Sequence, residues 1–165
     1  MHILSEQMSE FSKLYQKHAA DVFRFALYLS GNRAEAEDIT SETFVRVWTS
    51  PSELKMATVR SLLFAIARNL LLEGRRRSNR QRTLDESLPD QRPGPHRQAQ
   101  VRAEWDAVLA RLQRLPEIDR TALLLHALDG VPYEEIARAL GISVASAKVK
   151  VHRARLMLAQ GEKNV

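Results

Sequence analysis

Apolar residues recur every three or four positions along most of the chain, which is the period of an α-helix. The pattern predicts helices over about 5–30, 33–49 and 56–80, then from about 99 until Pro116, and over 117–128. We expect Gly31 and Asn32 to end the first helix in left-handed conformations. In the fourth helix one face carries the apolar side chains: Val101, Trp105, Val108, Leu109 and Leu112. We therefore expect an all-α fold.

Residues 131–158 predict two further helices joined by a tight turn. Pro132 suits a first helical turn, and Gly141 suits the left-handed residue that ends a helix. Ser143 can cap the second helix by accepting a hydrogen bond from an early backbone N–H. This order of helix, Gly-x-Ser turn and helix is typical of a helix-turn-helix, whose second helix enters the DNA major groove.

The second helix of this pair has two different faces. Residues three or four apart form a predicted buried seam: Val144, Ala147, Val151, Ala154 and Leu158. The residues between them form a mostly cationic outer face: Ser146, Lys148, Lys150, His152, Arg153 and Arg155. An ordinary helical hairpin with a solvated charged face is the alternative. The Gly141 turn and the small residues at the predicted helix crossing favour a DNA-binding helix.

Two segments suggest a division of the chain. Residues 75–82 hold five arginines in eight positions, which is more than a helix C-terminus needs and indicates a phosphate-contacting patch. Residues 83–98 are rich in proline and contain little that could be buried, so they predict a flexible linker. We expect two small helical domains, at 5–82 and 99–162, joined by this linker.

The composition narrows the function classes. A formal net charge of +5 over 165 residues suits a polyanionic partner. The absence of cysteine excludes disulfides and cysteine-bound zinc, and the five histidines lack metal-ligand spacing. With no signal segment and no apolar run of membrane-spanning length, we expect a cytoplasmic protein without membrane insertion. No nucleophile–base constellation or phosphate loop is present, so we expect no enzyme, no cofactor and no metal.

The order of motifs resembles that of a bacterial RNA polymerase sigma factor of the extracytoplasmic-function (ECF) type. In the first predicted domain the likeness rests on residues 36–40 (AEDIT) and 66–69 (IARN). In the second it rests on residues 115–117 (LPE), 133–137 (YEEIA) and 140–143 (LGIS). Asp129-Gly130 and the cations from Lys148 to Arg155 continue it. The likeness covers nearly the whole chain, and these motifs keep the family's order and spacing.

The chain departs from the family pattern at a few positions. Leu62 stands where a tryptophan is usual, Ser41 where a glutamine is common, and Glu73 where an aspartate is more usual. In the recognition helix Ala147 replaces a common valine, Lys148 and Lys150 stand where arginine is frequent, and Val149 replaces a small polar residue. Lysine cannot make the planar two-pronged contact of arginine with guanine, so base readout is expected to differ there.

The resemblance implies three sets of site residues. The polymerase-binding set, expected to dock on a coiled coil of the β′ subunit, is Asp38, Ser41, Glu42, Phe44, Val45 and Trp48. The set expected to hold the opened −10 element is Arg68, Asn69, Arg76, Arg77 and Arg80. The set expected at the −35 element is Ser146, Lys148, Val149, Lys150, His152, Arg153 and Arg155, with Lys150 and Arg155 on phosphates.

Some alternatives stay open at this point. Phe44 or Trp48 could fill the core of the first domain, and Asn69 could be an ordinary helix asparagine bonded to a neighbouring loop. The resemblance implies core RNA polymerase, through its β′ coiled coil and β flap, promoter DNA and an anti-sigma factor as partners. A stand-alone helix-turn-helix regulator is the competing function, although it leaves residues 36–48 and 75–82 without a role.

Overall fold

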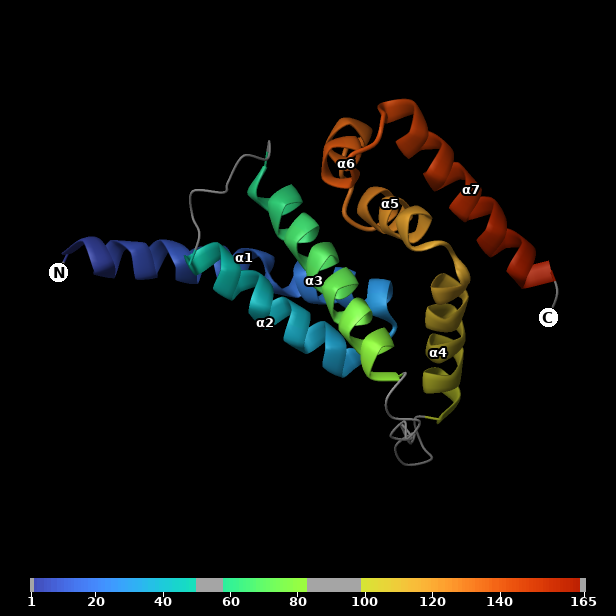
Figure 1. Cartoon of the computed structure of the whole chain (residues 1–165), viewed down its shortest axis with the longest axis horizontal. Coiled ribbons are helices and arrows are strands. Elements are labelled where there is room, and N and C mark those ends of the chain that lie inside the picture. The colour runs from blue at the N-terminus through green and yellow to red at the C-terminus, as the bar shows by residue number, and fades with distance from the viewer. Residues whose placement is uncertain (1, 50–57, 83–98, 164–165) are drawn as a thin grey trace.

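The structure is a computed structural model that describes residues 2–49, 58–82 and 99–163. All regular secondary structure in these ranges is helical (Figure 1). The first group of helices is α1 (His2–Ser30), α2 (Arg33–Thr49) and α3 (Val59–Arg82). The second group is α4 (Ala99–Arg114), α5 (Glu117–Ala127), α6 (Tyr133–Leu140) and α7 (Val144–Lys163). The predicted all-α fold is confirmed.

The first group packs around the apolar face of α3. Leu63, Phe64, Ala67 and Leu71 are each no more than 1% exposed, and the Phe25 ring of α1 lies 5.0 Å from that of Phe64. Helices α1, α2 and α3 contact one another in all three pairs. The N-terminal turns of α1 extend beyond this bundle, and its residues 2–10 are all exposed (Figure 1).

The turn between α1 and α2 corrects one prediction. Gly31 has a φ of +72°, as expected for a residue that ends a helix, but every positive φ in the described part of the chain belongs to glycine. Asn32 is therefore not left-handed. Its side-chain oxygen accepts a hydrogen bond from the Glu35 N–H at 3.0 Å, which makes it the cap of α2. The asparagine begins the second helix rather than ending the first.

Helix α5 is the centre of the second group, and every residue from Asp119 to Leu125 is buried. Among them, the guanidinium of Arg120 donates to the backbone oxygens of Leu112, Gln113 and Leu115 at 3.3–3.4 Å. It thereby joins α5 to the C-terminal turn of α4 and to Leu115, which follows that helix. Burial, together with the charge of Arg75, lowers the pKa of Arg120 to about 10, so it keeps its proton near neutral pH.

The helix-turn-helix forms as predicted. Gly141 ends α6 with a φ of +66°, and the Ser143 hydroxyl accepts the Ser146 N–H at 3.0 Å at the start of α7. In the seam of α7, Ala147, Val151 and Ala154 are at most 1% exposed. These small residues let α7 pack closely on α5 and α6, with which it is in contact. The opposite face of α7 is left at the surface.

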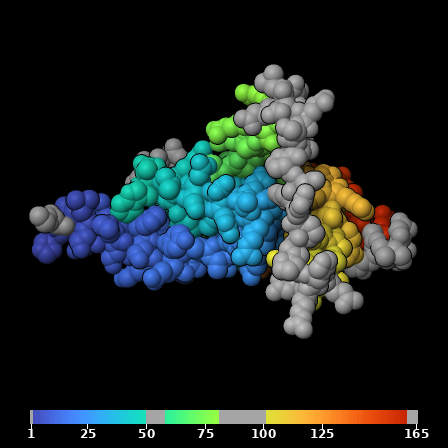
Figure 2. Space-filling model, turned by 90° about the horizontal axis from the view of Figure 1, so that it is seen from below, coloured from blue at the N-terminus to red at the C-terminus, as the bar shows by residue number. Residues whose placement is uncertain are grey.

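The two groups of helices also pack on each other. Helix α1 contacts α4 and α5, and helix α3 contacts α6. In the space-filling view the second group, in yellow to red, lies at one end of the first group, in blue to green (Figure 2). The predicted linker, 83–98, lies outside the described residues. The predicted apolar face of α4 is only partly buried: Leu109 and Leu112 are buried, whereas Val101 is 74% exposed.

Candidate nucleic-acid and polymerase interfaces

The outer face of α7 presents most of the residues predicted to contact the −35 element. Lys148, Val149, His152, Arg153 and Arg155 are exposed, and Ser146 and Lys150 are half-buried. Val149 lies opposite the buried seam and is 59% exposed. In Figure 1, α7 runs along the edge of the molecule farthest from α1 and α2, so its outer face is clear of the first group of helices.

The two edges of this face are held by neighbouring helices. On the α6 side, the Lys148 ammonium lies 5.8 Å from the centre of the Tyr133 ring, within the range of a cation–π contact. On the α5 side, Arg153 donates to both carboxylate oxygens of Asp119, at 2.8 and 3.0 Å. The Lys150 ammonium lies 4.0 Å from the same carboxylate. The hydrogen bonds and charge of Asp119 raise the pKa of Arg153.

Helix α3 divides the predicted −10 set. Asn69, Arg76, Arg77 and Arg80 are exposed, and positions 69, 76 and 80 recur on one helix face. Arg68 lies about one quarter-turn away and faces α5. There its guanidinium donates to both carboxylate oxygens of Glu117, at 2.7 and 3.0 Å. Four members of the set are thus exposed, and the fifth, Arg68, is hydrogen-bonded to α5.

The predicted polymerase-binding residues form one exposed stripe along α2, with one exception. Ser41 and Glu42 are adjacent and the other steps are of three residues, so these positions share one side of the helix, and all are exposed: Asp38, Ser41, Glu42, Val45 and Trp48. Phe44, by contrast, is 2% exposed and packs edge-on against Tyr15 at 4.9 Å. Phe44 fills the core, while Trp48 keeps 42% of its surface exposed beside Phe11.

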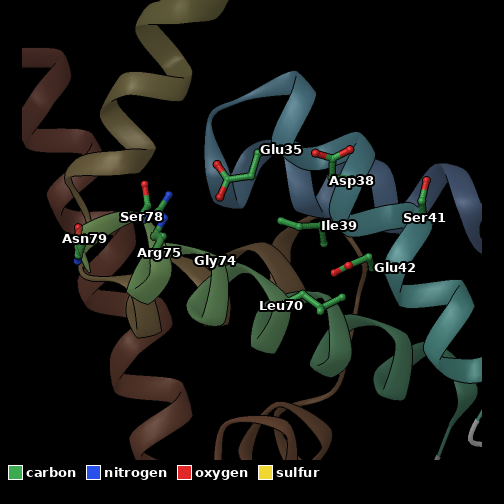
Figure 3. A pocket seen from close by; sticks show the side chains of 10 residues that line it. All are labelled: Glu35, Asp38, Ile39, Ser41, Glu42, Leu70, Gly74, Arg75, Ser78 and Asn79. Carbon is green, nitrogen blue, oxygen red and sulfur yellow. The ribbon is translucent and has the colours of Figure 1, made fainter. Parts of the chain in front are cut away.

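Two grooves flank this stripe. The first, of about 900 Å³, lies between α2 and α3, and Asp38, Ser41 and Glu42 line it from the α2 side (Figure 3). Arg75, Ser78 and Asn79 line it from α3. The second groove, of about 460 Å³, lies between α1 and α2. Its lining is mostly apolar: Met8, Phe11, Ser12, Tyr15, Val45 and Trp48. The stripe therefore has an acidic half and an apolar half.

Sequence reasoning missed a group of carboxylates where the two groups of helices meet. The side chain of Asp129 is fully buried and accepts hydrogen bonds from Arg24 and Arg60, each at 3.1 Å. Glu135 accepts hydrogen bonds from the hydroxyls of Ser61 and Thr58. Each carboxylate is at least 69 residues from its partners in the chain. The helical period of one segment cannot predict contacts between residues that far apart.

A further inter-group contact involves Gln113 of α4. Its amide donates to the Tyr28 backbone oxygen at 3.0 Å, and its side-chain oxygen accepts a hydrogen bond from Arg75 at 3.4 Å. Arg75 also donates to the Ser30 backbone oxygen, at 3.3 Å. This first arginine of the cationic run therefore supports the junction between the groups, whereas Arg76, Arg77 and Arg80 are exposed.

None of the helices that the structure describes is both long enough and apolar enough to cross a membrane. The surface features that the described residues offer are a half-cationic helix-turn-helix, a cationic end of α3 and a mixed acidic and apolar stripe on α2. This combination suits one polyanion and one protein partner.

Two families match the chain, one in each group of helices. Residues 14–81 match the family "Sigma-70 region 2" and residues 105–158 match "Sigma-70, region 4". The first range covers most of α1 and all but the last residue of α3, and the second range contains the helix-turn-helix. The residues predicted for the −10 element and the polymerase lie in the first range, and those for the −35 element lie in the second.

Curated relatives give the same assignment. The chain is 35% identical over 156 residues to the ECF RNA polymerase sigma factor SigE of Mycolicibacterium smegmatis, covering 92% of this chain and 61% of that protein. It is 30% identical over 145 residues to SigL of Mycobacterium tuberculosis, covering 86% of this chain and 82% of that protein. The chain belongs to the ECF sigma factors of RNA polymerase. These matches favour that class over a stand-alone helix-turn-helix regulator.

Solved structures share the fold. The sigma factor RpoE of Bartonella quintana, crystallised with the anti-sigma factor NepR, superposes with a TM-score of 0.74 at 23% identity, over 93% of this chain and 97% of that chain. CnrH in complex with the cytosolic domain of CnrY gives a TM-score of 0.74 at 22% identity, over 95% of this chain and 90% of that chain. The fold of the described residues is therefore shared with these proteins.

Proposed function

We propose that this chain binds core RNA polymerase and directs promoter-specific initiation of transcription by recognising −35 and −10 elements. The observation that carries the proposal is the pairing, within one chain, of a region 2 match at 14–81 with a region 4 match at 105–158. A stand-alone regulator needs only the second of these. The nucleotide chemistry then belongs to the polymerase, and this chain supplies binding and positioning.

The outer face of α7 is the proposed −35 reader. A helix buried along one side and cationic along the other fits the width of the major groove, with the phosphates at its edges. Val149 lies at the middle of this face and is exposed. It can make an apolar contact with a thymine methyl group, whereas a polar side chain at this position would form a hydrogen bond. Lys148 and His152 flank it and are exposed.

The exposed cationic end of α3 is the proposed −10 site. Arg76, Arg77 and Arg80 supply charge along a strand backbone, and Asn69 supplies a polar side chain on the same helix. Arg68 is paired with Glu117, and its side chain is only 15% exposed. A −10 contact of Arg68 therefore requires a rearrangement that exposes this side chain.

The stripe on α2 is the proposed surface for the β′ coiled coil of the polymerase. It combines an exposed tryptophan and valine with acidic neighbours, the arrangement of an aromatic centre and a charged rim that many interfaces share. Phe44 supports this surface from beneath. The second group of helices is proposed to bind the β flap of the polymerase. Both DNA-binding surfaces are then held by the same polymerase.

An anti-sigma factor is the proposed regulatory partner. The sigma factor RpoE of the same fold was crystallised with the anti-sigma factor NepR, and CnrH, also of this fold, is in complex with the cytosolic domain of CnrY. The exposed apolar groove between α1 and α2 and the exposed apolar residues of α4 are available for such a partner.

In-vitro transcription with purified core polymerase and a library of promoter fragments, at one stated salt concentration, tests the function. Adding the chain should produce transcripts that start a fixed distance downstream of paired −35 and −10 motifs. Core polymerase without the chain is the control. If no transcripts appear and the chain alone binds duplex DNA tightly, the stand-alone regulator is the correct function.

A further inference from the structure

A buried carboxylate from outside the helix-turn-helix contacts the recognition helix. Asp119 lies in the first turn of α5, and its side chain has no exposed surface. It accepts hydrogen bonds from the Nε and Nη2 atoms of Arg153, at 2.8 and 3.0 Å. The pair is two-pronged, which fixes the plane of the guanidinium as well as its distance from the carboxylate. Arg153 is thus held from a position 34 residues earlier in the chain.

The pair leaves part of the guanidinium free to bind something else. Arginine carries five N–H donors, and Asp119 occupies the two along one edge. The donors at the end of the guanidinium remain, and the Arg153 side chain is 53% exposed. Arg153 follows Val149 by four residues, so both lie on the outer face of α7. The end of a guanidinium can still form two parallel hydrogen bonds with one guanine.

A purely structural role would not call for this arrangement. Helix α7 is already anchored to α5 by Ala147, Val151 and Ala154, each at most 1% exposed. Burying a carboxylate is costly, and an apolar residue at position 119 would pack without that cost. The Lys150 ammonium lies 4.0 Å from the same carboxylate. Asp119 therefore also offsets positive charge at one edge of the DNA-binding face.

We propose that Asp119 is a positioning residue for promoter readout. It holds Arg153 in one orientation, with the free end of the guanidinium available to a single base pair of the −35 element. The inference rests on the proposed function, because it assigns to α7 the reading of that element. It adds that part of the sequence specificity is set from α5, outside the helix-turn-helix.

The test compares holoenzymes containing wild type, Asp119→Asn, Arg153→Lys or Arg153→Ala on a library in which every −35 position is varied. Asparagine has the shape of aspartate but cannot serve as a charged two-oxygen acceptor. We expect Asp119→Asn to reduce the preference at one base pair roughly tenfold, within the range of a lost two-pronged base contact. Arg153→Lys should lose the same preference, because lysine cannot form the planar fork.

The double variant separates positioning from independent effects. Asp119→Asn combined with Arg153→Ala should read promoters as Arg153→Ala does alone, since Asp119 acts through Arg153. Glu134→Gln is the control, because it removes one negative charge from the first turn of the neighbouring helix α6. It should leave every base preference unchanged. Arg153→Lys alters an exposed side chain, so it keeps the test open if Asp119→Asn folds poorly.

Three results would overturn the inference. The first is an equal loss at all −35 positions, the second is additive effects in the double variant, and the third is an unchanged preference in both Asp119→Asn and Arg153→Lys. Failure of the proposed function looks different, because then the wild-type chain itself would give no promoter-dependent transcripts. If the wild type is promoter-selective but the variants lose preference equally at all −35 positions, only the role of Asp119 is rejected.

Discussion

The guanidinium of Arg68 donates one hydrogen bond to each carboxylate oxygen of Glu117, at 2.7 and 3.0 Å, and so connects α3 to the first turn of α5. Both side chains are largely buried, at 15% and 22% exposed. Burial acts to raise the pKa of Glu117, but hydrogen bonds from Arg68 and Thr121 and the charges of Arg68 and Arg120 outweigh it. The pKa of this carboxyl therefore lies below its usual value.

A lowered pKa means that the charged form of Glu117 favours the folded state. This contribution is present above the unfolded pKa of 4.5 and is lost as the pH falls through the lower folded pKa. Replacing Glu117 by glutamine should lower the free energy of unfolding by about 1–3 kcal/mol at neutral pH. Urea denaturation measures it, with Glu37→Gln as the control, because the Glu37–Arg33 pair is exposed. Equal effects of the two variants would contradict the prediction.

Asp129, at the same junction, should behave in the opposite way. Burial raises its pKa by more than the hydrogen bonds and charges of Arg24 and Arg60 lower it. Ionised Asp129 thus lowers stability relative to the protonated form, and its contribution falls as the pH rises from 3.8 through the raised pKa. We expect Asp129→Asn to change the free energy of unfolding by less than about 1 kcal/mol, or to increase it. A loss as large as that of Glu117→Gln would contradict this.

His18 should make the stability depend on pH just below neutrality. Burial lowers its pKa from 6.5, Lys17 and Arg60 lower it further, and Asp21 opposes them. The unfolded chain therefore takes up the proton first, and stability should fall as the pH drops from about 6.5 through the lower folded pKa. Thermal unfolding between about pH 7.5 and 5.5 should show a smaller decrease for His18→Gln than for wild type. Parallel curves would assign the decrease to other groups.

Much of the fold follows from features within single helices. The seam of Ala147, Val151 and Ala154 and the turn at Gly141 lie where the helical period and the left-handed requirement of a helix end place them. The period also separates the outer face of α7 from its buried face. Asn32 was misassigned because asparagine suits both the end of one helix and the cap of the next, and only the backbone distinguishes them.

Contacts between helices could not be read from the sequence in the same way. Arg68 was predicted as a DNA contact because it lies in a motif, yet its partner Glu117 is 49 residues away. Asp119 and Asp129 look like ordinary surface acids in the sequence, and their burial follows from helix packing alone. The apolar residues of α4 were predicted to share one face, yet Val101 on that face is 74% exposed, because a period shows amphipathicity without showing what covers the face.

Two left-handed glycines should respond differently to substitution. Gly31 and Gly141 have φ values of +72° and +66°, so alanine at either should cost roughly 1–2 kcal/mol for the conformation alone. At Gly141 a Cβ would meet open space, whereas at Gly31 it would lie 3.0 Å from the Gln113 side chain. We expect Gly31→Ala to be the more destabilising, with the excess lost in a Gln113→Ala background. An excess that persists there would mean that Gln113 is not its cause.

Phe44 and Trp48 provide the sharpest test of the polymerase-binding stripe, because they lie one turn apart on α2 but differ in burial, at 2% and 42% exposed. Phe44→Ala should open a cavity and cost about 3–5 kcal/mol of stability. Trp48→Ala should cost far less stability but weaken binding to core polymerase roughly thirtyfold or more if Trp48 is an interface hot spot.

Equilibrium denaturation and competition binding to core polymerase, made on the same preparations, separate the two effects. Val59→Ala serves as the control, because Val59 is 39% exposed, close to the exposure of Trp48, but belongs to α3 and lines neither groove beside the stripe. It should leave polymerase affinity unchanged. If Trp48→Ala binds polymerase as tightly as the control does, the contact surface lies elsewhere on the first group of helices. The acidic half of the stripe at Asp38 and Glu42 would then be the next segment to vary.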